Sequence, residues 1–326
     1  MKKKIETYLA DWHFSKDLTK EQAALLTHIN YSFGLVVDGA VSIAHLENLD
    51  RFKAMMSKFP GLKYNLSVGG WGADGFSSAV ATPETREKLA DSAVRVLEEL
   101  DLNGLDWDWE YPGSDMAGIA CAKDDPVNMS AFLVLLRQKM DRLSERTGKK
   151  YELSIAAGAN RIHDYLWDQV EPVLDSVNLM TYDMVTEGQV AHVSNLCKCS
   201  HASYSVEQSV ADFTAAGVPR EKLLIGGTMY FHRYLGADAA APFGKPYREK
   251  GHPVSHDAVG EDYAHLWDEE AKAGYFVKGD ELLSGDDVRS MDAKRAYIEA
   301  ENLAGIILWE LNEDSANVLL PHIGNR

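Results

Sequence analysis

Three carboxylates stand at alternate positions of a short, otherwise apolar run in the first half of the chain. Residues 105–113 read LDWDWEYPG, so the acids are Asp106, Asp108 and Glu110. In a β-strand, side chains two positions apart point to the same side. The spacing therefore predicts that the three acids share one face and that Trp107 and Trp109 share the other.

Electrostatic repulsion between the three acids favours a row that keeps a proton, which could be used in acid catalysis. Carboxylates two positions apart on a strand lie roughly 7 Å apart, and at an effective dielectric constant of about 20 they repel by about 2 kcal/mol per pair. This repulsion exceeds the energy of one pKa unit, so the row is not fully ionised at neutral pH and titrates as a coupled set. We assign the working proton, and the role of general acid, to Glu110 because it ends the strand nearest the expected mouth of a site.

An acidic row has two other interpretations, a solvated face of a surface strand or a ligand set for Ca²⁺ or Mg²⁺. Two tryptophans occupy the opposite face, and no lysine or arginine lies inside the run to compensate the charge. These two features favour a functional site with perturbed carboxyl groups.

The chain of 326 residues is 45% hydrophobic and carries a formal net charge of −17. This length fits one large α/β barrel or two ordinary domains. Binding of nucleic acid or of an anionic membrane surface requires clustered lysine and arginine, so the acidic balance favours a neutral substrate. No linker, repeat or low-complexity tract divides the sequence.

The amino-terminal residues do not form a recognisable targeting signal. The basic residues 2–4 are followed by a segment too short and too polar for a secretory signal, and no run of about 20 apolar residues could span a bilayer. We expect a soluble monomer, cytoplasmic or secreted with its signal absent from this chain.

The three cysteines, Cys121, Cys197 and Cys199, do not make a disulfide framework because their number is odd and two of them are too close together. His192 and His201 flank the close pair and are zinc-type ligands, but the C-x-C spacing is tighter than in common zinc sites. We expect a plain surface loop here, without a metal or another cofactor.

Short apolar segments of β character alternate with longer segments of helical period. The strand candidates are residues 5–10, 28–37, 63–69, 104–110, 151–158, 176–183, 222–230 and 304–311. The helix candidates include residues 83–100, 128–146, 205–216 and 291–302. Eight such units predict an α/β fold, a single catalytic (β/α)8 TIM barrel over residues 1–326, with its chemistry at the carboxyl ends of the strands.

About 60 residues follow Tyr230 before the next clear helix, which is too long for an ordinary barrel loop. Residues 231–290 are therefore expected to form a reduced α+β insertion between the seventh strand and the seventh helix. The insertion is rich in aromatic residues, which could line one wall of a cleft or form a small core of their own.

Over nearly its whole length the chain resembles the chitinases of glycoside hydrolase family 18. The fourth-strand signature DGxDxDxE corresponds to NGLDWDWE at residues 103–110, with Asn103 in place of the first acid. The motif SxGG corresponds to residues 67–70, followed by Trp71, and MxYD corresponds to residues 180–183. At the seventh strand, residues 226–233 read GGTMYFHR, without the usual proline and with the arginine displaced by one. The insertion that follows resembles a shortened form of the α+β module of some of these enzymes, which predicts a shallow cleft.

The resemblance implies a chitinase that hydrolyses β-1,4-linked N-acetylglucosamine oligomers or polymer with retention, by substrate-assisted catalysis. The carbonyl oxygen of the 2-acetamido group would attack the anomeric carbon while Glu110 protonates the leaving oxygen. Asp108 would hold the acetamido N–H and stabilise the positive oxazolinium. Asp106 would share a proton with Asp108, and Tyr182 would donate its hydroxyl to the acetamido oxygen.

The resemblance also implies a set of substrate contacts. Trp309, at the end of the eighth strand, would form the apolar floor under the sugar, because pyranose faces stack on aromatic rings. Trp71 would stack on the leaving-group side. The other predicted contacts are Tyr8, Met180, Asp183 and Tyr230.

Two alternatives remain open from the sequence. One is a family relative that acts on N-glycans or peptidoglycan as an endo-β-N-acetylglucosaminidase, and the other is a non-catalytic chitin-binding lectin on the same barrel. The presence of Glu110 favours an enzyme, and WEYP at residues 109–112 favours a chitinase. The sequence does not distinguish exo from endo attack.

Overall fold

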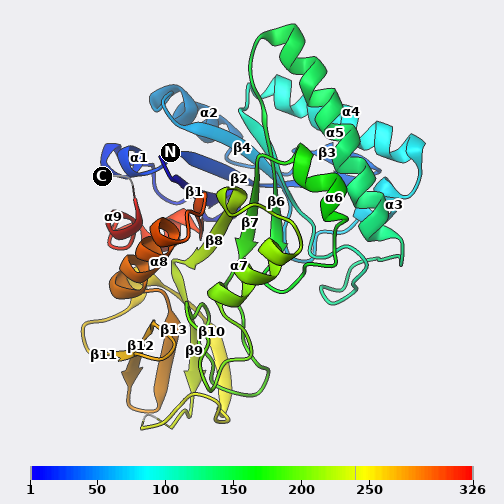
Figure 1. The fold of residues 1–326 in the computed structure, drawn as a ribbon. Helices are drawn as coiled ribbons and strands as arrows, with labels where there is room; N and C mark the ends of the chain where they lie inside the picture. Colours follow the sequence, from blue (N-terminus) through cyan, green and yellow to red (C-terminus); the bar gives the residue numbers. More distant parts are fainter. Residues whose placement is uncertain (1, 239, 325–326) are drawn as a thin grey trace.

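A computed structural model describes residues 2–238 and 240–324 (Figure 1). Eight parallel strands close a barrel, which confirms the predicted (β/α)8 architecture. They are β1 (Lys4–Ala10), β2 (His28–Val37), β4 (Lys63–Gly69), β5 (Gly104–Asp108), β6 (Glu152–Gly158), β7 (Ser176–Met180), β8 (Leu223–Thr228) and β14 (Gly305–Trp309). The strand order β1-β14-β8-β7-β6-β5-β4-β2 closes on itself because β2 also pairs with β1.

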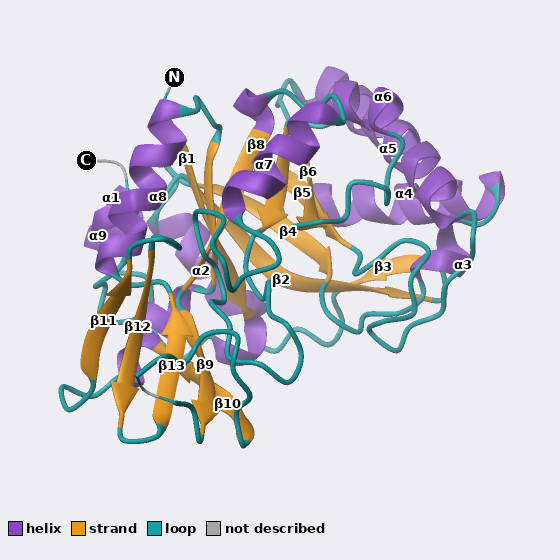
Figure 2. Ribbon diagram, turned by 60° about the horizontal axis from the view of Figure 1, so that its bottom comes forward, coloured by secondary structure: helices purple, strands orange, loops and turns teal. Residues whose placement is uncertain are grey.

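Helices surround the barrel (Figure 2). They are α1 (Lys20–Leu25), α2 (Leu49–Lys58), α3 (Phe76–Val80), α4 (Pro83–Glu99), α5 (Asp125–Thr147), α6 (Trp167–Val170), α7 (Val206–Ala215), α8 (Val288–Ala300) and α9 (Leu320–Ile323). The four predicted helices correspond to α4, α5, α7 and α8. Thr82 caps α4 by accepting a hydrogen bond from the backbone N–H of Thr85 at 3.2 Å. No described helix is long and apolar enough to cross a membrane.

The apolar face of β5 packs against the helical layer. Trp107 is fully buried, with its ring 4.7 Å from that of Phe132 in α5. Trp109 is also fully buried and stacks on Phe76 of α3 at 5.2 Å. Both tryptophans thus pack outward as the alternation predicted, and the acids on the other face of β5 are turned into the barrel.

Four barrel strands end earlier than the sequence indicated, and β8 and β14 do so at Thr228 and Trp309. β5 ends at Asp108, and β7 ends at Met180. Past these points the chain leaves the hydrogen-bonded ladder, and Asp183 adopts the left-handed conformation with φ of 54°. Glu110, Tyr182 and Asp183 therefore lie on loops that continue from the carboxyl ends of the strands, where barrel enzymes carry their chemistry.

The insertion between β8 and α8 forms a second sheet beyond the barrel (Figure 1). Its antiparallel order is β10-β9-β13-β12-β11. The strands are β9 (Tyr230–Leu235), β10 (Glu249–Ser255), β11 (Ala264–Asp268), β12 (Ala273–Lys278) and β13 (Glu281–Gly285). The described part of residues 231–290 holds no α-helix before α8, so this segment differs from the α+β composition that we expected. Aromatic residues at neighbouring positions, as in AGYFVK at residues 273–278, favour strands over helices.

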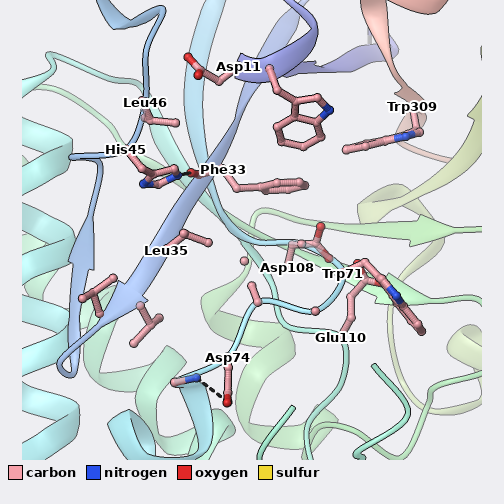
Figure 3. Close-up of a pocket in the computed structure, with 18 of the residues that line it drawn as sticks. Asp11, Phe33, Leu35, His45, Leu46, Trp71, Asp74, Asp108, Glu110 and Trp309 are labelled. Atoms are coloured by element: carbon pink, nitrogen blue, oxygen red, sulfur yellow. Dashed lines mark hydrogen bonds between the residues drawn. The ribbon is translucent and has the colours of Figure 1, made fainter. Parts of the chain in front are cut away.

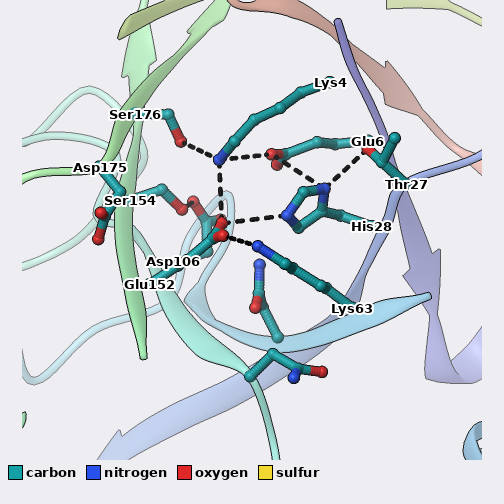
Figure 4. A network of polar contacts seen from close by, with 12 residues as sticks. Lys4, Glu6, Thr27, His28, Lys63, Asp106, Glu152, Ser154, Asp175 and Ser176 are labelled. Atoms are coloured by element: carbon teal, nitrogen blue, oxygen red, sulfur yellow. Dashed lines mark hydrogen bonds and ion pairs between the residues drawn. The ribbon is translucent and has the colours of Figure 1, made fainter. Parts of the chain in front are cut away.

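Charged side chains join the amino ends of four barrel strands (Figure 4). Glu152, the first residue of β6, accepts from Lys4 of β1 at 3.0 Å and contacts His28 of β2 at 3.0 Å. It also pairs with Lys63 of β4. Burial alone would raise the pKa of Glu152, but the contacts with His28 and Lys4 lower that pKa well below its ordinary value. One carboxylate thus cross-links four strands at the mouth opposite the acidic row.

We predict that Glu152→Gln lowers the free energy of unfolding by about 3 kcal/mol at pH 7. The change removes the carboxylate that Lys4, His28 and Lys63 share and leaves Lys4 and His28 with Glu6 as their remaining carboxylate. Urea denaturation measures this loss. Since the pKa is depressed in the folded state, the contribution is complete above the ordinary carboxyl pKa of about 4.3 and is lost as the pH falls below it. The difference between variant and wild type should therefore shrink at pH 3.

Glu145 on α5 is exposed and provides the matched control. Glu145→Gln should change stability by less than about 0.5 kcal/mol. Equal stability of Glu152→Gln and the wild type at pH 7 would show that the network does not stabilise the barrel.

Candidate active site

Asp106 lies at the centre of the barrel and is fully buried. Its Oδ2 accepts hydrogen bonds from the hydroxyls of Tyr8 at 3.0 Å and Ser67 at 2.8 Å. Its Oδ1 accepts from Ser154 at 2.7 Å and from the amide of Asn178 at 3.1 Å. Burial raises the pKa of Asp106, and these hydrogen bonds oppose the rise. Because the donors come from β1, β4, β6 and β7, four strands fix one carboxyl group.

Asp108 is 3% exposed, and its Oδ1 has no hydrogen-bond partner among the described residues. Burial raises its pKa well above the ordinary value, and the charges of Glu110 and Asp106 add to the rise. Burial also raises the pKa of Glu110 to about 7. The hydrogen bond with the Tyr111 hydroxyl lowers this pKa, and the charge of Asp183 raises it further. The row therefore retains protons near neutral pH.

The sharing of a proton between Asp106 and Asp108 stays a prediction. All four hydrogen bonds of the Asp106 carboxyl group go to side chains of other strands, and none goes to Asp108. Asp108 therefore keeps an oxygen free to meet a ligand.

Asp183 is the anionic member of the site. Its Oδ1 accepts from the Tyr230 hydroxyl at 2.7 Å and lies 2.8 Å from Nε2 of His232. Burial alone would raise its pKa, but the contacts with His232 and Tyr230 lower it. The ionised carboxylate then raises the pKa of Glu110. Tyr230, which we predicted to contact substrate, is itself buried behind Asp183 and lines neither cavity described next.

A groove passes Glu110 and extends to both sides of it. A cavity of about 1050 Å³ lies on one side and a cavity of about 630 Å³ on the other. Both are lined by the same five residues at the carboxyl ends of the strands, namely Trp71, Glu110, Met180, Tyr182 and Asp183. The larger cavity adds Asp108 and Trp309, and the smaller adds Tyr111 and Arg161. An extended ligand can therefore contact Glu110 with groups on either side.

Aromatic rings form a wall of the larger cavity (Figure 3). The rings of Trp309 and Phe33 are nearly parallel, with an interplanar angle of 14° and centroids 5.7 Å apart. Trp12 is 60% exposed and lies 5.9 Å from Phe33. Trp71, at the junction of the two cavities, is 61% exposed. In the view of Figure 3, Trp71 lies with Asp108 and Glu110 below the rings of Phe33 and Trp309. These surfaces suit the flat apolar faces of sugars.

Two glycines make room for the site. A Cβ on Gly69, at the end of β4, would come within 2.0 Å of the backbone oxygen of Asp108. A Cβ on Gly226 of β8 would come within 2.7 Å of the Tyr182 ring. Any larger residue at either position would displace Asp108 or Tyr182. This close approach explains why the third position of the SxGG motif, Gly69, is a glycine.

The structure divides the predicted residues into two layers. Asp108, Glu110, Tyr182, Asp183, Met180, Trp71 and Trp309 line the groove, whereas Asp106, Tyr8 and Tyr230 lie behind them. The Tyr8 hydroxyl reaches Asp106 rather than the cavity. We did not predict Trp12 and Phe33 from the sequence. Trp12 follows the first strand directly, and the rule that barrel sites form at strand ends could have identified it.

Two clusters in the described part of the chain have metal-ligand chemistry, and neither involves the acidic row. One comprises His192, His201 and Asp268, and the other His13, Glu310 and Glu313. Asp106, the innermost acid of the row, is held by hydroxyl and amide donors, an arrangement that suits proton chemistry.

The known proteins that this chain resembles carry the same fold. A solved family 18 N-acetylglucosaminidase from Paenibacillus barengoltzii is 37% identical and superposes with a TM-score of 0.92 over 98% of both chains. Chitinase A1 of Niallia circulans is 30% identical over 83% of this chain and 43% of its own length. Chitotriosidase-1 of Mus musculus is 28% identical over 95% of this chain and 73% of its own length. This chain thus spans about half to three quarters of these two relatives.

The family model for glycosyl hydrolases family 18 matches residues 4–314, from the first strand of the barrel to the turn after the last. Together with the closed barrel and the acidic row on its fourth strand, this match shows that the chain belongs to family 18 of the glycosyl hydrolases.

Proposed function

We propose that this chain hydrolyses β-1,4 linkages between N-acetylglucosamine units of chitin or its oligomers, with retention, and that the 2-acetamido group of the substrate is the nucleophile. The observation that carries the proposal is the free Oδ1 of Asp108, which is buried on the floor of the groove next to Glu110. A buried hydrogen-bond acceptor without a donor destabilises the folded protein. The N–H of an acetamido group would supply the missing hydrogen bond.

The positions of the carboxyl groups support substrate assistance. Most retaining glycosidases place a second carboxylate about 5 Å across the scissile bond from the acid, as a nucleophile. Here Asp106 and Asp108 lie on β5 and Glu110 follows two residues after its end, and the Asp183 carboxylate is engaged by Tyr230 and His232. An internal nucleophile from the sugar removes the need for an enzyme carboxylate on the opposite side.

The first step breaks the glycosidic bond. The acetamido oxygen attacks the anomeric carbon, the bond to the leaving oxygen breaks, and Glu110 gives its proton to that oxygen. Asp108 orients the acetamido group and stabilises the positive oxazolinium, and Tyr182 donates to the acetamido oxygen. In the second step Glu110 takes a proton from water, which attacks the anomeric carbon from the side that the leaving group vacated. The bond between that carbon and the acetamido oxygen breaks, so the acetamido group is restored and the configuration is retained.

The different linings of the two cavities support a placement for each half of the substrate. Trp309 and Asp108 line only the larger cavity, so the sugar that carries the reacting acetamido group lies there. The leaving sugar lies toward Trp71 and the smaller cavity, with Tyr111 and Arg161. Sugars on both sides of Glu110 favour oligomers over a single terminal unit, and the products released from chitohexaose would show where the enzyme cuts.

We predict that Glu110→Gln lowers kcat by roughly 10²- to 10⁴-fold, because glutamine cannot donate a proton to the leaving oxygen. Affinity for chitohexaose should stay within a few fold, as measured by calorimetry on the inactive variant. Glu99→Gln, at the exposed end of α4, is the matched control and should turn over normally. Normal turnover by Glu110→Gln would remove this residue from the mechanism.

We predict that neither cellulose nor fully deacetylated chitosan is cleaved, because neither offers an acetamido oxygen. Release of reducing ends measures this directly, with chitohexaose as the positive control under the same conditions. Cleavage of either polymer at a rate near that of chitohexaose would refute substrate assistance.

We predict that kcat/KM falls above about pH 7, as the general acid Glu110, with a pKa of about 7, loses its proton in the free enzyme. Because the charge of Asp183 raises this pKa, Asp183→Asn should move the alkaline limb to lower pH. The pH profile of kcat/KM measures the midpoint, and Glu99→Gln should leave it unchanged. An alkaline limb that does not move would show that Asp183 does not set the proton affinity of Glu110.

A further inference from the structure

Two histidines and an aspartate converge outside the groove. His192 and His201 lie on the loop between β7 and α7, and Asp268 is the last residue of β11. Nε2 of His192 is 3.0 Å and Nε2 of His201 is 2.8 Å from Oδ2 of Asp268. The three donor atoms lie within 4.8 Å of one another. The sequence placed both histidines near each other but gave no sign of Asp268.

Hydrogen bonds explain the position of His192 beside Asp268 but not that of His201. Oδ1 of Asp268 accepts from the backbone N–H groups of Glu270 at 2.9 Å and Ala271 at 3.1 Å, which turns Oδ2 toward the histidines. Nε2 of His192 is within hydrogen-bonding distance of that oxygen. Nε2 of His201 is closer still to that oxygen, yet it makes no hydrogen bond with it or with any other described residue.

Aromatic packing holds both imidazoles in place. The Phe243 ring stacks on His192 with centroids 3.7 Å apart and on His201 at 5.1 Å. Tyr275 packs edge-on against Phe243 at 5.0 Å. His192 is fully buried, while His201 is 21% and Asp268 13% exposed. The cluster is therefore rigid on its inner side and reachable from solvent on its outer side.

We propose that Nε2 of His192, Nε2 of His201 and Oδ2 of Asp268 bind one Zn²⁺ ion, with water in the fourth position. Imidazole nitrogen and carboxylate oxygen are common zinc ligands, at about 2.0 to 2.2 Å. A tetrahedral site with such bonds places its ligand atoms about 3.3 Å apart, close to the two separations found here. The ion would occupy the point that the His201 ring faces.

The site would clamp the β7–α7 loop to the insertion sheet. The same loop already contacts the sheet through the N–H of Val193, which donates to Ser284 at 3.1 Å, and the N–H of Cys197, which donates to the Ala271 carbonyl at 3.1 Å. Its residues Met184 and Tyr204 line the smaller cavity. Zinc would thus stabilise one wall of the leaving-group side without touching the acidic row.

Metal binding to the full chain tests the proposal. After treatment with a chelator and desalting, the chain should take up one equivalent of zinc, measured by mass spectrometry of the metal and by calorimetry, and its Tm should rise by several degrees. Mg²⁺ at the same concentration should produce neither effect. His201→Ala and Asp268→Asn should each weaken zinc binding by at least about 100-fold while circular dichroism shows a folded chain.

The second cluster and the neighbouring thiol provide the controls. His13→Ala, at the cluster with Glu310 and Glu313, should keep the bound equivalent, as should Cys199→Ser. Absence of zinc binding at tens of micromolar would overturn the proposal, as would wild-type affinity in His201→Ala. Loss of the bound equivalent in His13→Ala or Cys199→Ser would also overturn it, because the ligands would then be other residues.

Discussion

The burial of one carboxyl group at the barrel centre is the constraint on which the rest of the site depends. Asp106 can be fully buried only because four strands each present it with a donor. A buried carboxyl group without such donors would be strongly destabilising. The register of β1, β4, β6 and β7 relative to β5 is therefore tied to this residue, and that register places Asp108 and Glu110 in the groove.

The carboxyl groups of the row become more exposed from the barrel centre toward its mouth. Asp106 has its full set of hydrogen bonds, Asp108 has an oxygen without a partner, and Glu110 reaches the mouth with a pKa of about 7. Asp183 is ionised on the facing loop, where its side chain is about half exposed and its contacts with His232 and Tyr230 lower its pKa. Glu110 and Asp183 thus lie in the same groove with opposite shifts in pKa, upward for Glu110 and downward for Asp183. Perturbed pKa values of this kind are typical of active sites.

The sequence predicted what is encoded locally. The eight strands and the acidic row follow from alternation within short segments, and the packing of Trp107 and Trp109 follows from the same alternation. Contacts between distant segments could not be predicted in this way: Tyr230 with Asp183, and Asp268 with His192 and His201, meet only when the insertion folds against the β7–α7 loop. One local signal was missed. Asp38 and Gly39, with φ of 50° and 72°, form the turn of a hairpin between β2 and β3 (Ala40–Ser42), and an Asp-Gly pair favours such a turn.

The ionic network around Glu152 separates two tasks within the barrel. It cross-links the strands at one mouth, whereas every residue that lines the groove belongs to the other. Loops at the groove can accordingly change in length and composition without weakening the closure of the sheet. The mouth that carries the groove can therefore tolerate mutations, so that new sugar specificities can arise while the framework persists.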